Sequence, residues 1–250
     1  MPLLFEEIDC QDTPIGDISL RRRADPRLGG EIIYEVKLGD EFLMSSLFPE
    51  AEIQLSTLGL AALKASLKNS GNDGKQGLDI IVGGLGLGYT AAAALEDSDV
   101  SSMVVIDVMA AVIDWHQRGL VPLGDTLSND ARCNLHHGDF FAMATSTDSG
   151  FYPNEPERLA HGVLLDIDHS PSHWLAPENS SFYCEAALQQ LSDKLYSGGL
   201  FGLWSNDLPD PEFSALLDTV FARSEAHVVH FPNPYTGGES TNSVYLAFKE

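Results

Sequence analysis

Cysteine is scarce in this chain of 250 residues, and its three copies do not suggest pairs. Cys10, Cys133 and Cys184 are far apart and odd in number, which argues against a disulfide framework and a cysteine-based metal site. The start of the sequence lacks the basic segment of a signal peptide, and no apolar run is long enough to cross a bilayer. We therefore predict a reduced, cytoplasmic protein with no membrane partner.

Basic residues are also scarce. The sequence contains 14 Lys and Arg against 37 Asp and Glu, which gives a formal net charge of −23. Such a surface repels nucleic acid phosphates, so we expect no nucleic acid partner. It attracts cations, among which a polyamine substrate is one candidate, but a solubilising surface would have the same composition. The one basic run, residues 21–23, is short and is predicted to lie on a solvated strand face.

Glycine, in contrast, is concentrated in one place. Gly84, Gly86 and Gly88 follow the apolar run 78–82 and precede an alanine-rich segment. A strand, a glycine turn and a helix in this order are typical of a nucleoside- or phosphate-binding corner of an α/β sheet. The glycines allow a sharp turn and close approach of a ligand, and the helix start offers free N–H groups.

Strand-like and helix-like segments alternate after this corner, which predicts a doubly wound, mostly parallel Rossmann-like sheet over residues 49–250. Residues 1–48 instead contain strand-like segments separated by turn signals, and we predict a small N-terminal β-appendage there. The polar stretches 119–130 and 145–161 are predicted to be surface loops. The strands expected in the main sheet are 78–82, 103–107, 131–135, 163–166 and 200–204, with 226–231 and 244–248 as an antiparallel pair.

Four acids follow the predicted strands, where open α/β sheets bind their ligands. Asp107 lies about twenty residues beyond the glycines, a spacing at which a carboxylate accepts ribose hydroxyls, although it would also serve as a helix cap. Asp139 suits either the exocyclic amine of adenine or an N-cap. Asp166 and Asp168 end the next strand. A nicotinamide dinucleotide would use the glycines and Asp107 equally well, but it does not need the adenine contact of Asp139.

Several of these segments together resemble the spermidine synthase family, the polyamine aminopropyltransferases, whose catalytic domain has the class I S-adenosylmethionine-dependent methyltransferase fold. That resemblance implies a seven-stranded sheet and an adenosyl-sulfonium co-substrate, either S-adenosylmethionine or its decarboxylated form, with no metal. The segments that carry it are 81–88, 104–113, 137–141 and 163–171, followed by 198–204 and 231–238.

The resemblance also assigns roles to single residues. It implies that Asp166 and Asp168 are catalytic, with Asp166 in place of the acid that deprotonates the attacking amine. It implies that Tyr235 lines an acceptor pocket. We expect His169 and Trp174 in the same pocket, and Trp174, Trp204 and Tyr235 follow strand ends and would form its wall, although each of the three would also suit core packing. The donor site implied by the resemblance and the strand ends consists of Gly84, Gly86, Gly88, Asp107, Val108, Gly138, Asp139 and Phe140.

The sequence departs from the family at the acceptor wall. Residues 39–54 correspond to a segment in which the family carries Asp-Gly, Gln, Asp-Glu and Tyr-His in that order, and the Gln and the Tyr-His of this pattern are absent here. The family's Asp-x-x-Asp-Pro is replaced by residues 166–171, Asp-Ile-Asp-His-Ser-Pro. Glu50 or Glu52 would add anchoring for an amine. No Lys or Arg lies near the glycine loop, which favours a donor without a carboxylate. A metal bound by His169 and His173 is disfavoured, because 170–171 break regular spacing.

The sequence therefore predicts a transferase that moves an aminopropyl group to an amine such as putrescine. A small-molecule methyltransferase on the same fold is the first alternative. A non-catalytic nucleoside-binding protein is the second, since the acceptor wall does not match. The resemblance also implies a homodimer.

Overall fold

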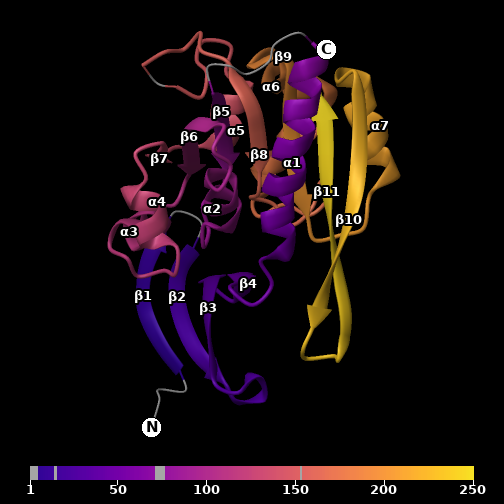
Figure 1. The fold of residues 1–250 in the computed structure, drawn as a ribbon. Coiled ribbons are helices and arrows are strands. Elements are labelled where there is room, and N and C mark those ends of the chain that lie inside the picture. The colour runs from indigo at the N-terminus through magenta and orange to yellow at the C-terminus, as the bar shows by residue number, and fades with distance from the viewer. Residues whose placement is uncertain (1–4, 14–15, 71–76, 153) are drawn as a thin grey trace.

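A computed structural model describes residues 5–13, 16–70, 77–152 and 154–250, and within these it contains two β-sheets. Figure 1 shows the four-stranded N-terminal sheet in indigo at one end of the molecule and the larger sheet, flanked by helices, at the other. No helix in the described part of the chain is long and apolar enough to cross a membrane.

The larger sheet has seven strands in the order β10-β11-β9-β8-β5-β6-β7. Five strands run parallel, and β11 pairs antiparallel with β9 and β10. The predicted doubly wound sheet with an antiparallel pair is therefore confirmed. The strands are β5 (Leu78–Gly83), β6 (Val100–Asp107), β7 (Cys133–His137), β8 (Ala160–Leu165), β9 (Leu195–Ser205), β10 (Arg223–Asn233) and β11 (Gly238–Phe248).

Helices cover both faces of this sheet, and each face has its own hydrophobic cluster. The prediction of a surface loop over 119–130 is wrong in part, because α4 forms within this stretch. Leu127 of α4 and Val121, which precedes the helix, are both buried. The helices are α1 (Glu50–Asn69), α2 (Tyr89–Leu95), α3 (Ala110–Gln117), α4 (Gly124–Asn129), α5 (Phe140–Thr145), α6 (Glu185–Asp193) and α7 (Pro211–Val220), with short 3-10 turns at Pro26–Leu28 and Pro177–Phe182.

The N-terminal sheet is an antiparallel meander of β1 (Phe5–Thr13), β2 (Gly16–Asp25), β3 (Glu31–Leu38) and β4 (Glu41–Ser45). The polar strand β1 lacks the alternation that would have predicted it. Buried side chains of β2 and β3 join the same hydrophobic cluster as Leu85 and Leu87 of the glycine loop. The appendage therefore packs directly against the glycine loop.

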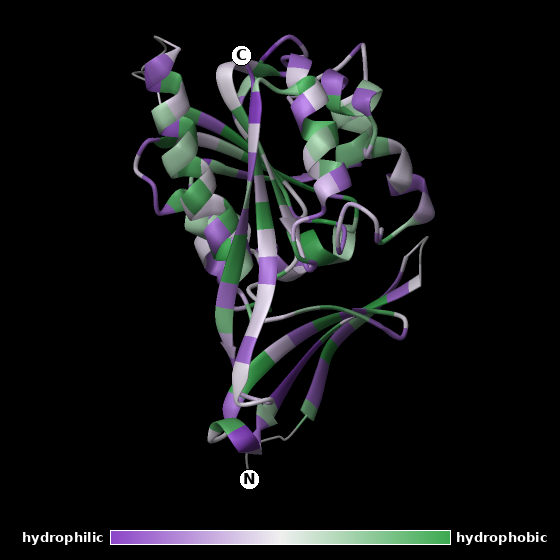
Figure 2. Ribbon diagram, turned by 90° about the vertical axis from the view of Figure 1, so that its right-hand side faces the viewer, coloured by the Kyte–Doolittle hydropathy of each residue, from purple (hydrophilic) through white to green (hydrophobic). Residues whose placement is uncertain are grey.

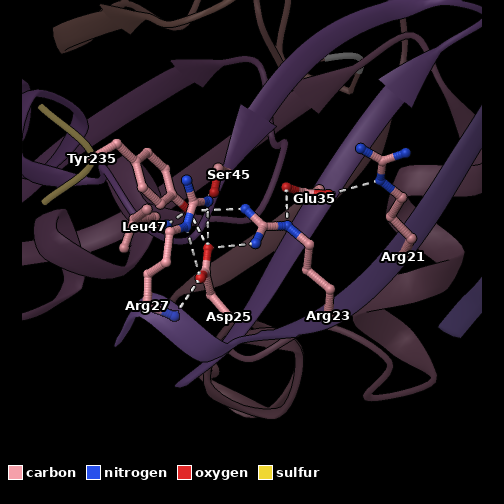
Figure 3. Close-up of polar contacts among 8 residues, drawn as sticks. All are labelled: Arg21, Arg23, Asp25, Arg27, Glu35, Ser45, Leu47 and Tyr235. Carbon is pink, nitrogen blue, oxygen red and sulfur yellow. Dashed lines mark hydrogen bonds and ion pairs between the residues drawn. The ribbon is translucent and has the colours of Figure 1, made fainter. Parts of the chain in front are cut away.

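The sequence predicted a solvated face for the arginines of β2, and Arg22 is exposed, but Arg21 and Arg23 lie in an ion-pair network. Arg21 and Arg23 both pair with the buried carboxylate of Glu35, at 2.7 and 2.8 Å. Arg23 and the Tyr235 hydroxyl both donate to Asp25, at 2.7 and 2.9 Å (Figure 3). Because Tyr235 lies between β10 and β11, this network attaches the long hairpin, which reaches down to the N-terminal sheet in Figure 2, to the appendage.

Candidate active site

A cavity of about 980 Å³ lies where the carboxyl ends of the parallel strands meet the N-terminal sheet. Its walls come from the loops that follow β5 and β8, from the ends of β6 and β9, from β4 and from the first residues of β11. The structure brings eight of the predicted site residues to this cavity, namely Gly84, Gly86, Asp107, Val108, Asp139, Phe140, Asp166 and His169.

The glycine loop passes close to its neighbours at each predicted glycine. Gly84 has φ +93°, and a side chain there would collide with the backbone oxygen of Asp166. Gly86 has φ +46° and lies beneath the Met44 thioether of β4. Gly88, with φ +90°, does not line the cavity, and a side chain there would collide with Leu127 and His116. Two glycines thus open the cavity, and the third permits packing behind it.

His116 supports this loop from behind. Its Nε2 lies 2.9 Å from the carbonyl oxygen of Gly86, and its Nδ1 is buried without a partner. Burial lowers the pKa of His116 to about 4, so the ring is neutral at physiological pH. A neutral ring with its proton on Nε2 donates to Gly86. This role could not be predicted from the sequence, because a lone histidine on a helix is usually a packing residue.

Backbone N–H groups of the glycine loop and of the start of α3 hold the carboxylate of Asp107, the residue predicted to bind ribose. Its two carboxylate oxygens accept from the backbone N–H groups of Leu85, at 2.9 Å, and Met109, at 2.7 Å, and Gly86 donates to it as well. Burial nevertheless raises its pKa above the ordinary value. The carboxylate is fixed at the cavity wall, with lone pairs left for hydroxyl donors.

Asp139 is the N-cap of α5, as the capping interpretation predicted. Its Oδ1 accepts from the N–H of Ala142 at 3.0 Å, while the residue is exposed at the cavity. The other oxygen has no partner among the described residues. Phe140 is buried beneath Gly83, and Val108 keeps 56% of its surface exposed at the cavity wall. Gly138, next to Asp139, is not among the lining residues.

Two neighbouring carboxyls lie at the opposite end of the cavity. Asp166 accepts from the Thr90 hydroxyl at 2.7 Å, and burial raises its pKa to about 6. Glu52, from the first turn of α1, is 6% exposed, and its Oε2 has no partner. Burial, and then repulsion from Asp166, raise the pKa of Glu52 well above its ordinary value. The pair therefore holds a proton more tightly than free carboxyls do, and a cation next to it would lower both pKa values.

Asp168 does not line the cavity. It is 3% exposed and accepts from the Leu175 N–H and the Asn179 side chain, both at 2.7 Å, and from the Tyr183 hydroxyl at 2.8 Å. These bonds fold the segment between β8 and α6, which contributes Leu175 and Asn179 to the cavity wall. The structure thus assigns Asp168 to the support of that wall.

His169 lies at the cavity and contacts a carboxylate of the N-terminal sheet. Its Nε2 is 2.9 Å from Oε1 of Glu41, and its ring centroid is 5.1 Å from that of His173, which also lines the cavity. Trp174 is exposed and donates to the Pro171 carbonyl, and it does not line the cavity.

Tyr235 is likewise absent from the cavity lining, and its hydroxyl belongs to the Asp25 network. Trp204 lines the cavity instead, and its indole N–H is buried without a partner. Glu52 and Trp204 thus place one hydrogen-bond acceptor and one donor without partners in the part of the cavity that contains Asp166. Buried polar groups of this kind are uncommon in folded proteins, so both atoms are candidates for contact with a ligand.

Charge is one-sided in this cavity. Among the described residues that line it there is neither Lys nor Arg. No group of three or more His, Cys, Asp or Glu in the described ranges could hold a metal ion. The acids at the wall are Glu52, Asp107, Asp139, Asp166 and Glu178.

The comparisons with known proteins agree with this architecture. No family model matches the chain, and neither does any curated protein. Among solved structures, a spermidine synthase in complex with the transition-state analogue AdoDATO matches with a TM-score of 0.70 at 14% identity, over 98% of this chain and 74% of that one. The chain has a spermidine synthase-like class I methyltransferase fold.

Two further structures show how wide this likeness is. A probable spermidine synthase from Corynebacterium glutamicum ATCC 13032 matches with a TM-score of 0.63 at 15% identity, over 96% of this chain and 79% of that one. Human methyltransferase-like protein 13 in complex with SAH matches with a TM-score of 0.55 at 17% identity, over 78% of this chain and 82% of that one. At these identities the likeness shows the fold and not the activity.

Proposed function

We propose that this protein is a transferase that binds decarboxylated S-adenosylmethionine and moves its aminopropyl group to an amine such as putrescine. The observation that carries this proposal is the one-sided charge of the cavity, whose described lining has five acids and neither Lys nor Arg. A sulfonium donor and an ammonium acceptor are both cations, and carboxylates stabilise both of them. The likeness to spermidine synthases supports the same conclusion.

The donor's adenosine fits the end of the cavity near β6 and β7. Asp107 is placed to accept the ribose hydroxyls, and the second oxygen of Asp139 to accept from the adenine amine. Val108 offers an exposed apolar surface to the base, with Phe140 beside it. The sulfonium then lies near Gly84, whose Cα approaches the backbone of Asp166.

Asp166 acts as the proton acceptor in this proposal. A protonated amine transfers a proton to its carboxylate, and the freed nitrogen attacks the carbon bonded to sulfur. The carbon–sulfur bond breaks, its electron pair stays on sulfur, and methylthioadenosine leaves as a neutral thioether. A carboxyl whose pKa is raised to about 6 is a better base than an ordinary one, while it is still ionised at neutral pH.

Other residues of the acceptor end hold the amine. Glu52 adds a carboxyl next to Asp166, and Trp204 supplies the edge of an aromatic wall. Asp168 is a positioning residue in this assignment, because its three hydrogen bonds support the wall rather than the substrate. His169, held by Glu41, offers a further polar contact.

Methyl transfer to a small molecule is a second candidate, favoured by the likeness to a human methyltransferase-like protein solved with SAH. A panel of thermal shifts separates the candidates. Methylthioadenosine and decarboxylated S-adenosylmethionine are expected to raise the unfolding temperature more than S-adenosylmethionine, S-adenosylhomocysteine or NAD. A ligand at a hundredfold excess over its Kd stabilises the folded state by about 2.7 kcal/mol.

Turnover completes the test. Wild-type protein, incubated with the decarboxylated donor and putrescine, is expected to release methylthioadenosine, and Asp166→Asn is expected to stop the release. Methyl transfer from S-adenosylmethionine would favour the second candidate. Binding without turnover across a panel of amines would instead support a non-catalytic nucleoside-binding protein. No shift with any adenosyl-sulfur compound would refute the donor site itself.

A further inference from the structure

The N–H groups of the glycine loop already have partners within the protein. Gly84 donates to the carbonyl oxygen of Ile106 at 2.9 Å, and Gly88 to that of Leu85 at 2.7 Å. Leu85 donates to the Asp107 carboxylate at 2.9 Å.

The two remaining groups of the loop complete this account. The N–H of Gly86 helps to stabilise the charged carboxylate of Asp107, and Leu87 donates to the Met44 sulfur at 3.0 Å. Four of the five N–H groups between residues 84 and 88 thus have a hydrogen-bond partner and the fifth interacts with Asp107, although such loops are common anion sites.

Met44 provides the weakest of these partners and the only one from the N-terminal sheet. A thioether is a poor hydrogen-bond acceptor compared with a carbonyl or carboxylate. Its sulfur and methyl group also lie against Gly86 on the side where a Cβ would be. Met44 lines the cavity, so its side chain covers the loop at the point where the loop faces the ligand.

The charges around Met44 reinforce its effect. A carboxylate placed at the loop would lie among the acids of the cavity, including Asp166 and Glu52, with no Lys or Arg among the described lining residues. It would lose water and gain neither a cation nor a free N–H group. A burial of this kind is strongly unfavourable. A donor tail that ends in an ammonium has the opposite balance.

We propose that Met44 is a specificity residue that excludes donors carrying an α-carboxylate, because its thioether covers the glycine loop and occupies the Leu87 N–H. This inference rests on the proposed function, since it concerns the donor of that same site. It explains in physical terms how a methyltransferase fold can favour a donor without a carboxylate. The N-terminal sheet, through β4, thereby selects the ligand of a loop in the other sheet.

Isothermal titration with two donors tests the assignment, because S-adenosylmethionine and its decarboxylated form differ by the carboxylate alone. Wild-type protein is expected to prefer the decarboxylated donor. Met44→Ala frees the Leu87 N–H and opens the space above Gly86, so this N–H can donate to the carboxylate of S-adenosylmethionine. The ratio of the two Kd values is therefore expected to fall roughly tenfold, the effect of one hydrogen bond to a charged group. Methylthioadenosine, which lacks both tails, serves as the reference and is expected to bind both proteins within about threefold.

Met44→Leu provides a second test if the alanine variant does not fold. Leucine keeps the bulk but has no acceptor atom, so a smaller narrowing, of about threefold, is expected. An unchanged preference in whichever of these variants folds would overturn the role of Met44 while leaving the proposed function intact. If wild-type protein binds neither methylthioadenosine nor the decarboxylated donor, the proposed function itself fails.

Discussion

The two ends of the cavity differ in how well their polar groups are matched. At the donor end, backbone N–H groups hold the carboxylates of Asp107 and Asp139. At the acceptor end, Glu52 Oε2 and Trp204 Nε1 are buried with no partner. Carboxylates that already have partners are held in place before any ligand arrives, whereas buried groups without partners are destabilising until a ligand completes them. The two ends therefore differ in what a bound ligand is expected to change.

The largest expected effect comes from breaking the matched end. Asp107→Ala removes the proposed ribose contact and the acceptor for three backbone N–H groups, so the thermal shift with methylthioadenosine is expected to disappear. Asp139→Ala removes a cap and one proposed contact, and weaker binding, rather than none, is expected. A full ligand-induced shift in folded Asp107→Ala would mean that Asp107 only shapes the loop. Circular dichroism of both variants provides the check on folding.

The next effect concerns chemistry at the unmatched end. Asp166→Asn keeps the shape of the side chain but removes the proposed base, so a loss of turnover of about 10²–10⁴-fold is expected. Affinity for methylthioadenosine is expected to stay within a few-fold, because the donor end is untouched.

The wild-type rate gives an independent check on Asp166. It should fall below a pH of about 6 as the carboxyl is protonated. If Asp166→Asn retains wild-type turnover, the base lies elsewhere, and His169 would be examined first because it also lines the cavity.

Asp168→Asn is the matched comparison for Asp166. Its carboxylate accepts three hydrogen bonds in the segment between β8 and α6. Replacement leaves at least one of these donors poorly matched, so a lower unfolding temperature and a raised KM for the acceptor are expected. An unchanged KM together with a large fall in kcat would instead assign chemistry to Asp168, as the sequence implied.

The geometry of the glycine loop and its neighbouring acids was largely predictable from sequence because local rules determine it. Glycines after a buried strand and acids at strand ends follow from backbone sterics and sheet topology, and the seven-stranded sheet places them together. The acceptor end depends on contacts between distant segments. Met44 reaches the loop across 43 positions of sequence, and nothing in the composition of β4 indicates this contact.

Tyr235 and Asp168 were predicted to lie in the site, but the structure gives them other positions. Both have residue types suited to a polar pocket, yet their partners are structural ones. Which of two neighbouring acids faces a cavity depends on the turn of the chain after β8. That turn is fixed by hydrogen bonds to Leu175 and Asn179, several residues later. Residue type alone does not distinguish these cases.

A smaller effect is expected for stability at the unmatched end. The folded-state pKa values of Glu52 and Asp166 lie above their ordinary values, so the folded protein holds these protons more tightly than the unfolded chain does. The free energy of unfolding therefore decreases as pH rises from about 4 through about 6, where Asp166 loses its proton in the folded state, and Glu52 extends the decrease to higher pH. Glu52→Gln removes one of the two buried carboxyls and its repulsion from Asp166. A rise of about 2–4 °C in unfolding temperature is expected at pH 7.5, equivalent to about 1 kcal/mol.

The same variant provides its own pH control. At pH 4 the carboxyls are protonated in the wild type, so the difference in unfolding temperature should shrink. Glu178→Gln removes an exposed acid of the same cavity and is expected to change stability by less than about 0.5 kcal/mol. Equal gains from both variants would point to general charge repulsion in this acidic protein, not to the buried pair.

The smallest effect on the site is expected for Tyr235→Phe, which tests the boundary of the acceptor end. The hydroxyl donates to Asp25 at 2.9 Å and accepts from Arg23 at 2.9 Å, so its loss should lower stability by about 1 kcal/mol. Donor affinity and the KM for the acceptor are expected to stay unchanged, because Tyr235 does not line the cavity. A raised KM without a loss of stability would bring the hairpin into the acceptor site. In that case the acceptor would be bound by the β10–β11 hairpin as well as by the buried carboxyls of Glu52 and Asp166.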